Sequence, residues 1–174
     1  MSAAVPAHGA SDRTGVLLTN LGTPDAPTTE AVCRYLAEFL SDTSVIELSP
    51  LLWQPILHGV ILRVRPRKSA AAYARIWTGG GSPLLSISKQ QAGRIDAALT
   101  RQLPDDAIVT ALGMRYGTPS IASALAFLSA ANVRRLLVFP LYPQYSAATT
   151  GSTFDAVANV LKDWRWVPEL RFIN

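Results

Sequence analysis

Residues 136–161 read LLVFPLYPQYSAATTGSTFDAVANVL, and this stretch contains both of the periodicities that decide the fold. Its first four residues form a continuous apolar run, which is typical of a strand buried on both faces of a sheet. Its end repeats apolar side chains at helical spacing, through Phe154, Val157, Ala158 and Leu161. The stretch therefore predicts a buried strand, a turn rich in proline and hydroxyl side chains, and then a helix.

The same alternation extends over most of the chain. Similar apolar runs occur in residues 16–18, 108–112 and 170–173. Strands separated by helices predict right-handed crossovers, so we expect an α/β fold: a doubly wound parallel sheet with helices on both faces. The expected helices cover about 28–40, 50–64, 69–77, 86–103 and 121–128, besides the one that ends at Leu161.

The composition restricts the class of protein. The chain has 174 residues, of which 49% are hydrophobic and 16% charged, so it can bury a core and is not a disordered protein. Its net charge of +4 comes from scattered basic residues without a nucleic-acid-binding motif, and we expect no nucleic-acid partner. The single cysteine, Cys33, excludes a disulfide framework and fits a reducing compartment, so we expect a cytoplasmic protein.

The domain plan expected from the sequence is one lobe. Residues 1–13 read as a flexible tail, and residues 14–174 as an α/β lobe with an apolar segment at about 50–64. This segment contains Gln54, Pro55 and His58 and is shorter than the roughly 18 apolar residues that cross a bilayer. A basic run follows it, which is either a solvated surface or a site for anionic headgroups or carboxylates; it consists of Arg63, Arg65, Arg67 and Lys68.

The turns after the predicted strands indicate a binding cleft. In a doubly wound sheet, ligands bind outside the carboxyl ends of the strands, which here lead into residues 20–25, 113–119 and 140–146. These turns are rich in glycine, proline and tyrosine and contain one arginine, so they suit a flat or apolar ligand with an anionic corner. Only Gly22 stands where a dinucleotide site needs several glycines, and the run 79–82 (GGGS) follows a helix, so it is expected to terminate that helix.

Groups for catalysis are scarce in this sequence. His8 lies in the tail, His58 is expected at the surface, and Cys33 is expected to be an inert, partly buried thiol. Asp25 is the one acidic residue in the expected cleft turns, and no metal-ligand cluster can be assembled. The residues therefore indicate a binding face without an evident catalytic group.

Four strings of sequence resemble the ferrochelatase family; they are VLLTNLGTPDAP, YARIWTGGGSPL, GMRYGTPS and LYPQYSAATTGS. The resemblance runs from Gly15 to the end of the chain. It implies insertion of ferrous iron into protoporphyrin IX to form protohaem, the last step of haem biosynthesis. Family members have two similar chelatase-like lobes, and this chain resembles the amino-terminal one. The family's catalytic histidine and glutamate lie in the other lobe, so we expect a fragment that lacks the second lobe and is inactive alone.

The resemblance also assigns roles to residues of this chain. It places a porphyrin site at Leu21, Ser82, Pro83, Leu84, Arg115, Tyr116 and Tyr145. Arg115 would bind a carboxylate of the ligand, or alternatively form a buried pair that fixes the lobe. Residues 51–62 match the family's lip over the cleft, where Trp53, Ile56 and Leu57 would present apolar surface to porphyrin or a membrane. Ordinary packing of an amphipathic helix is the alternative for the lip.

Two departures from the family pattern concern its ligands. Some members bind a two-iron two-sulfur cluster partly through a cysteine at the position of Ala147, so we expect no cluster and no resident metal or cofactor here. Relatives that use coproporphyrin commonly have tyrosine at the position of Leu21, so leucine favours protoporphyrin. Peripheral membrane contact through the lip is also expected. Two other functions stay open: a non-enzymatic tetrapyrrole-binding module and a nucleotide-binding α/β domain.

Overall fold

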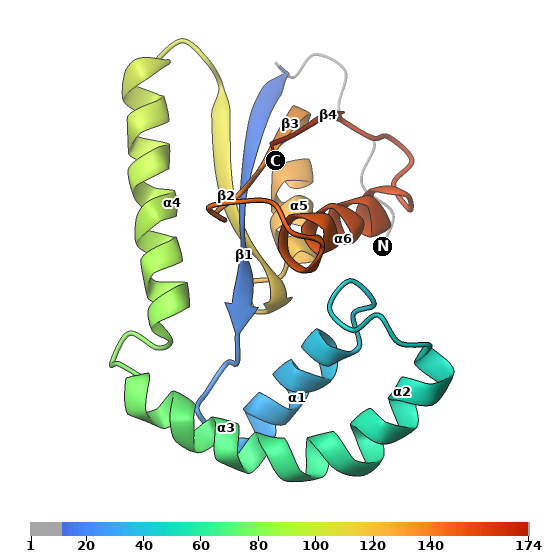
Figure 1. The fold of residues 1–174 in the computed structure, drawn as a ribbon. Coiled ribbons are helices and arrows are strands. Elements are labelled where there is room, and N and C mark those ends of the chain that lie inside the picture. Colours follow the sequence, from blue (N-terminus) through green and yellow to red (C-terminus); the bar gives the residue numbers. More distant parts are fainter. Residues whose placement is uncertain (1–11, 174) are drawn as a thin grey trace.

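The computed structural model describes residues 12–173 and contains a four-stranded sheet of the predicted kind (Figure 1). All neighbouring strands are parallel, and their order across the sheet is β2-β1-β3-β4. The strands are β1 (Arg13–Thr23), β2 (Ile108–Gly117), β3 (Val133–Pro140) and β4 (Glu169–Phe172). Each apolar run of the sequence overlaps one of them, so the predicted parallel sheet is confirmed.

Helices occupy the connections between the strands. The first connection carries α1 (Thr29–Leu40), α2 (Pro50–Ile56), the π-helical turn η1 (Leu57–Ile61), α3 (Leu62–Ile76) and α4 (Pro83–Gln102). The second carries α5 (Ile121–Ala130), and the third carries the π-helical turn η2 (Ala147–Gly151) and α6 (Ser152–Leu161). Among the helices of residues 12–173, none has both the length and the apolar character needed to cross a membrane.

The two faces of the sheet are covered by different helices. Leu17 of β1 packs in a core cluster with Leu125 of α5 and Val157 of α6, all three fully buried. Asn20, three residues further along β1, points to the other face, where its amide nitrogen donates to Ser88 Oγ of α4 at 3.1 Å. The sheet is therefore doubly wound, as predicted, with α5 and α6 on one face and α4 on the other.

The helices α1, α2 and α3 lie below the carboxyl ends of β1 and β2 rather than on a face of the sheet (Figure 1). α1 begins after Thr28, whose side-chain oxygen accepts from Ala31 N at 3.2 Å and caps the helix. α1 packs against α3. This group of helices forms a second layer across the sheet edge at which ligands of doubly wound folds bind.

The first two strands are longer than their apolar runs. β1 starts at Arg13, which was expected in the tail, and it continues through the predicted turn as far as Thr23; the rest of the expected tail, 1–11, lies outside the described residues. β2 likewise continues to Gly117. The polar ends of the strands are stabilised by specific contacts, such as the Asn20–Ser88 hydrogen bond. The pattern of apolar residues does not predict contacts of this kind.

The segment 50–76 is continuous helix, although a break was expected near residue 65. The helix continues through Pro66, which has no N–H to donate to the carbonyl of Leu62. The thiol of Cys33 on α1 lies 3.8 Å from that carbonyl oxygen and partly satisfies it. α3 ends at Ile76 because Trp77 adopts an extended conformation, and Thr78 and Gly81 then close a tight turn, so the glycine run connects α3 to α4.

Candidate functional site

Most of the residues assigned to a ligand site lie at the carboxyl edge of the sheet. In the β1–β2 register, Asn20 pairs with Met114 and Gly22 with Tyr116, which places Leu21 beside Arg115. Ser82 is buried and precedes α4, which Pro83 and Leu84 begin at the same edge (Figure 1). Tyr145 follows β3 and is 59% exposed. One sheet edge therefore brings together residues from four separate segments.

A network of hydrogen bonds at this edge centres on Asp42, which follows α1. Arg115 Nη2 and the hydroxyl of Tyr116 both donate to Asp42 Oδ2, the latter at 2.7 Å. Ser152 Oγ donates to the same oxygen at 2.5 Å, and Ser44 N donates to Oδ1 at 2.7 Å. Arg115 Nε donates to Ser152 Oγ at 2.6 Å. This Asp42 cluster joins the loop after α1, the end of β2 and the start of α6.

The ionic pair in the Asp42 cluster is largely shielded from solvent. The side chains of Asp42 and Arg115 are only 8% and 18% exposed. Burial by itself would raise the pKa of Asp42, but hydrogen bonds from Ser152, Tyr116 and Ser44 and the charge of Arg115 outweigh it, so the pKa lies below its ordinary value. Burial raises the pKa of Tyr116 above the ordinary tyrosine value, which keeps its hydroxyl a donor.

The surroundings of Tyr116 correct one prediction from the sequence. Its side chain is fully buried, with its ring edge-on to Phe39 at 5.1 Å between centroids and the Arg115 guanidinium 4.4 Å from the ring centre. The ring is enclosed by its own lobe, so it does not offer a face to a ligand. Arg115 forms a buried ion pair with Asp42, which was the alternative to binding a carboxylate of the ligand.

The lip divides into a buried side and an exposed side. Trp53 donates its indole N–H to the carbonyl of Leu40 at 2.7 Å, and Ile56 is half-exposed. Leu57 is fully buried, so its expected place on the exposed surface is wrong; η1 turns this side chain inward, where the turn contacts α1.

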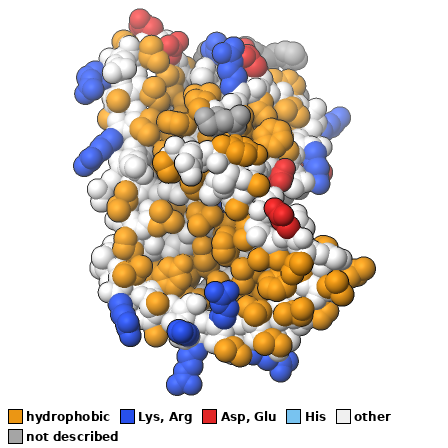
Figure 2. Space-filling model, viewed as in Figure 1, with side chains coloured by type: hydrophobic (Ala, Val, Ile, Leu, Met, Phe, Trp, Pro, Cys, Tyr) orange, Lys and Arg blue, Asp and Glu red, His pale blue; other side chains and the backbone are white. Residues whose placement is uncertain are grey.

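The exposed side of this helical segment forms an apolar surface, visible over α2 at the lower right of Figure 2. Leu51 is 87% exposed, and the others are exposed to 47–70%. Four of these residues are spaced at i, i+4, which places them on one face of the helix. We call it the lip patch; it comprises Leu51, Leu52, Ile56, Val60 and Val64.

The basic run adjoins the lip patch on α3. Arg63, Arg65, Arg67 and Lys68 are all exposed, and none of them takes part in an ion pair between described residues. His58 is exposed as well, as the sequence predicted. An apolar surface with uncompensated positive charge beside it suits a contact with an anionic amphiphile.

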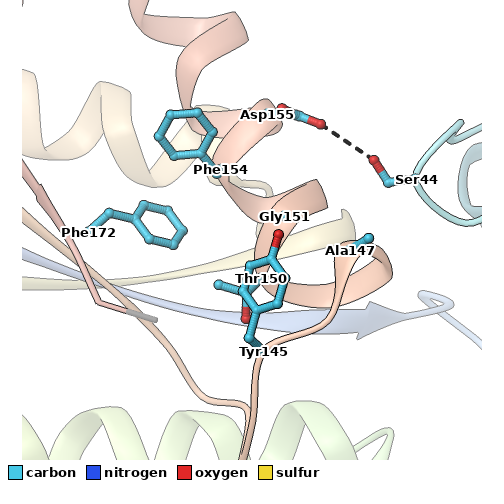
Figure 3. Close-up of a pocket in the computed structure, with 8 residues that line it drawn as sticks. All are labelled: Ser44, Tyr145, Ala147, Thr150, Gly151, Phe154, Asp155 and Phe172. Atoms are coloured by element: carbon cyan, nitrogen blue, oxygen red, sulfur yellow. Dashed lines mark hydrogen bonds between the residues drawn. The ribbon is translucent and has the colours of Figure 1, made fainter.

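A pocket of about 490 Å³ lies beside η2 and α6 (Figure 3). Phe154 and Phe172 meet edge to face on one side of it, with 5.4 Å between their ring centroids. On the other side, Ser44 Oγ donates to Asp155 at 3.4 Å, and Ala147 is part of the lining. A methyl group thus stands at the position where the resemblance placed a cluster-binding cysteine.

Comparison with known proteins agrees with the fold and with the family resemblance of the sequence. The family model described as Ferrochelatase matches residues 13–174. The chain is 54% identical over 167 residues to "Ferrochelatase 2" of Shewanella oneidensis, covering 96% of this chain and 50% of the relative. It is 55% identical over 167 residues to "Ferrochelatase" of Thioalkalivibrio sulfidiphilus, covering 96% of this chain and 45% of the relative. The chain spans about half the length of these curated relatives, and it belongs to the ferrochelatase family.

Proposed function

We propose that this chain is the porphyrin-binding amino-terminal lobe of an enzyme that inserts ferrous iron into protoporphyrin IX. The observation that carries the proposal is the family match over residues 13–174, combined with Leu21, Ser82–Leu84 and Tyr145 at one sheet edge beside an apolar lip. Iron and porphyrin are substrates here, and protohaem is the product.

The chemistry determines what such a lobe has to supply. Two protons leave the inner pyrrole nitrogens as ferrous iron sheds water and binds the four nitrogens. A planar porphyrin hides its lone pairs, so an enzyme gains rate by binding a distorted ring that resembles the transition state. The lobe supplies a fixed wall for that distortion, and the Asp42 cluster stiffens the wall. The histidine and glutamate of the family's other half handle the protons or the metal.

Three features favour protoporphyrin over a porphyrin with more carboxylates. Leu21 presents an aliphatic side chain at the end of β1 and is partly exposed. The lip patch adds apolar surface, which suits vinyl groups better than carboxylates. Arg115 is already paired with Asp42, so a ligand carboxylate has less free positive charge to meet there.

We also propose that this lobe holds no iron–sulfur cluster. Ala147 cannot ligate iron, and Cys33 sits on α1 against the carbonyl of Leu62, far along the chain from Ala147. Iron and sulfide analysis of the purified protein, together with its visible absorbance, tests this proposal. Bound iron and sulfide in equal amounts would contradict it.

We further propose peripheral contact with a cytoplasmic membrane surface. The lip patch and the basic run are adjacent in sequence and both exposed, which is the pattern of a segment that lies on an anionic bilayer. Cosedimentation with phosphatidylglycerol vesicles is expected to exceed that with phosphatidylcholine vesicles and to fall with added salt. Equal binding to both vesicles would contradict the charge argument.

A nucleotide-binding domain is disfavoured by the geometry around Gly22. A Cβ on this residue would lie 1.8 Å from the carbonyl oxygen of Tyr116, and its φ is +107°. The glycine is thus required by the close approach of β1 and β2, without a phosphate to accommodate. A tetrapyrrole-binding module without catalysis is the remaining alternative, and only activity separates it from the proposal.

The test is metal insertion by the chain alone and by a version extended with a second lobe from a family member. Zinc or ferrous iron and protoporphyrin are mixed with each protein, and metallation is followed by absorbance and fluorescence. We expect the extended protein to metallate porphyrin and the 174-residue chain to bind it without turnover. Turnover by the chain alone would show that catalysis does not need the other half, and His58 would be the first residue to replace.

A further inference from the structure

We propose that Asp42 is a positioning residue of the porphyrin site: it holds Arg115 in place and ties the lip to the sheet edge. This inference rests on the proposed function and adds a residue to it. Asp42 belongs to none of the sequence strings that carry the family resemblance. Its role follows from contacts that the folded chain alone creates.

The first argument is the convergence of donors on one carboxylate. Arg115, Tyr116 and Ser152 lie 73, 74 and 110 residues away in sequence, yet all three donate to the same oxygen of Asp42. A neutral acceptor in place of the Asp42 carboxylate would leave the charge of the guanidinium uncompensated. An asparagine amide there would also direct its N–H groups toward other donors. No other described residue forms a salt bridge with Arg115, so Asp42 is the ionic partner of this cation, which also donates to Ser152.

The second argument is the place of Asp42 in the chain. It lies between the end of α1 and the start of the lip helix α2. Its own carbonyl accepts from Val45 N at 3.0 Å and Ile46 N at 2.9 Å, so the loop turns around this residue. The carbonyl of Asp42 therefore fixes the turn of the loop that leads to the lip, and its carboxylate attaches this loop to β2 and α6.

These two roles meet at the candidate site. Leu21 lies beside Arg115 in the sheet, and the lip rises from the loop that Asp42 anchors. Loss of the Asp42 carboxylate removes the ionic partner of Arg115 and also detaches the loop before α2 from β2 and α6. A ligand held between the sheet edge and the lip then loses the alignment of both walls.

The experiment titrates protoporphyrin IX into the 174-residue chain and follows quenching of tryptophan fluorescence. We expect Asp42→Asn to weaken binding by about tenfold or more, the effect of losing one charge-assisted hydrogen bond. The same variant is expected to speed chymotrypsin cleavage within residues 43–57 in the absence of porphyrin. Leu128→Ala is the matched control, because Leu128 is buried against Gly15 near the start of β1, away from the site.

The control separates positioning from general loss of stability. Leu128→Ala destabilises the lobe but is expected to leave porphyrin affinity and cleavage of the lip unchanged. Unchanged affinity in Asp42→Asn, or an equal loss of affinity in Leu128→Ala, would overturn the inference while leaving the proposed function intact. If Asp42→Asn does not fold, Tyr116→Phe removes a single donor and is expected to weaken binding about threefold to tenfold. Absence of porphyrin binding in the unmodified chain would instead overturn the proposed function, and this inference with it.

Discussion

Replacing Arg115 by alanine leaves the Asp42 carboxylate without its ionic partner. The wild-type guanidinium donates to Asp42 and to the hydroxyl and carbonyl of Ser152, and it lies over the ring of Tyr116. Removal of one partner of a largely buried pair costs about 3–5 kcal/mol, and the remaining exposure of Arg115 places the expected value toward the lower end. We therefore expect Arg115→Ala to lower the free energy of unfolding at pH 7 by about 3 kcal/mol.

The loss is expected to depend on pH in a defined direction. The pKa of Asp42 is lowered in the folded lobe, so its ionised form contributes stability above the ordinary aspartate value of 3.8, and that contribution is lost as the pH falls through the folded pKa. Without Arg115 this pKa rises, so acid removes less stability from the variant. The difference between variant and wild type is therefore largest near neutral pH and shrinks as the pH falls below the ordinary aspartate value of 3.8 (about 1.4 kcal/mol per pKa unit).

Urea unfolding followed by circular dichroism at several pH values measures this difference. Arg34→Ala is a matched control, since Arg34 pairs with Glu30 at 2.8 Å but the two side chains are 60% and 86% exposed. We expect the control to lose less than about 0.5 kcal/mol at any pH. A loss below about 1 kcal/mol for Arg115→Ala at pH 7, or a loss independent of pH, would refute the view that Arg115 and Asp42 form a buried structural pair.

Three further perturbations test the fold and the lip. Gly22→Ala is expected to abolish soluble expression, because the new Cβ would lie 1.8 Å from a backbone oxygen at a φ of +107°; a soluble variant with native circular dichroism would contradict this. Leu17→Ala empties a fully buried core position and should cost about 3–5 kcal/mol in urea unfolding, and a cost below about 1 kcal/mol would argue against the core. Leu52→Glu combined with Ile56→Glu should leave unfolding unchanged, since both residues are exposed, while abolishing binding to phosphatidylglycerol vesicles; retained binding would show that the lip patch does not touch the membrane.

The sequence was sufficient for the sheet because each strand carries an apolar run. It was not sufficient for the strand ends, where Asn20 and Gly22 continue β1 through contacts with Ser88 and Tyr116. Apolar periodicity predicts only the apolar part of a strand. A polar residue whose hydrogen-bond partner lies on a distant helix has no neighbouring sequence pattern that would place it in the strand. For the same reason the helix through Pro66 was not predicted, since a thiol from another helix contacts the carbonyl that Pro66 leaves without its helical donor.

The candidate site was partly predictable for a similar reason. The positional rule for doubly wound sheets located the edge, and the family resemblance assigned Leu21, Ser82 and Tyr145 to it. The rule does not tell which side chains at that edge face outward. Tyr116 and Arg115 turned inward because Asp42 gives their polar atoms a buried partner, and the loop residue Asp42 has no sequence signal that links it to β2.

The most direct test of the proposed porphyrin site is hydrogen exchange of the chain with and without protoporphyrin IX. Porphyrin is expected to protect peptides that contain Leu21, Ser82–Leu84 and the lip, and to leave the opposite sheet edge around Gly15 and Val109 unchanged. Protection confined to that opposite edge, or no protection anywhere at saturating porphyrin, would contradict the assignment of the carboxyl edge as the binding surface.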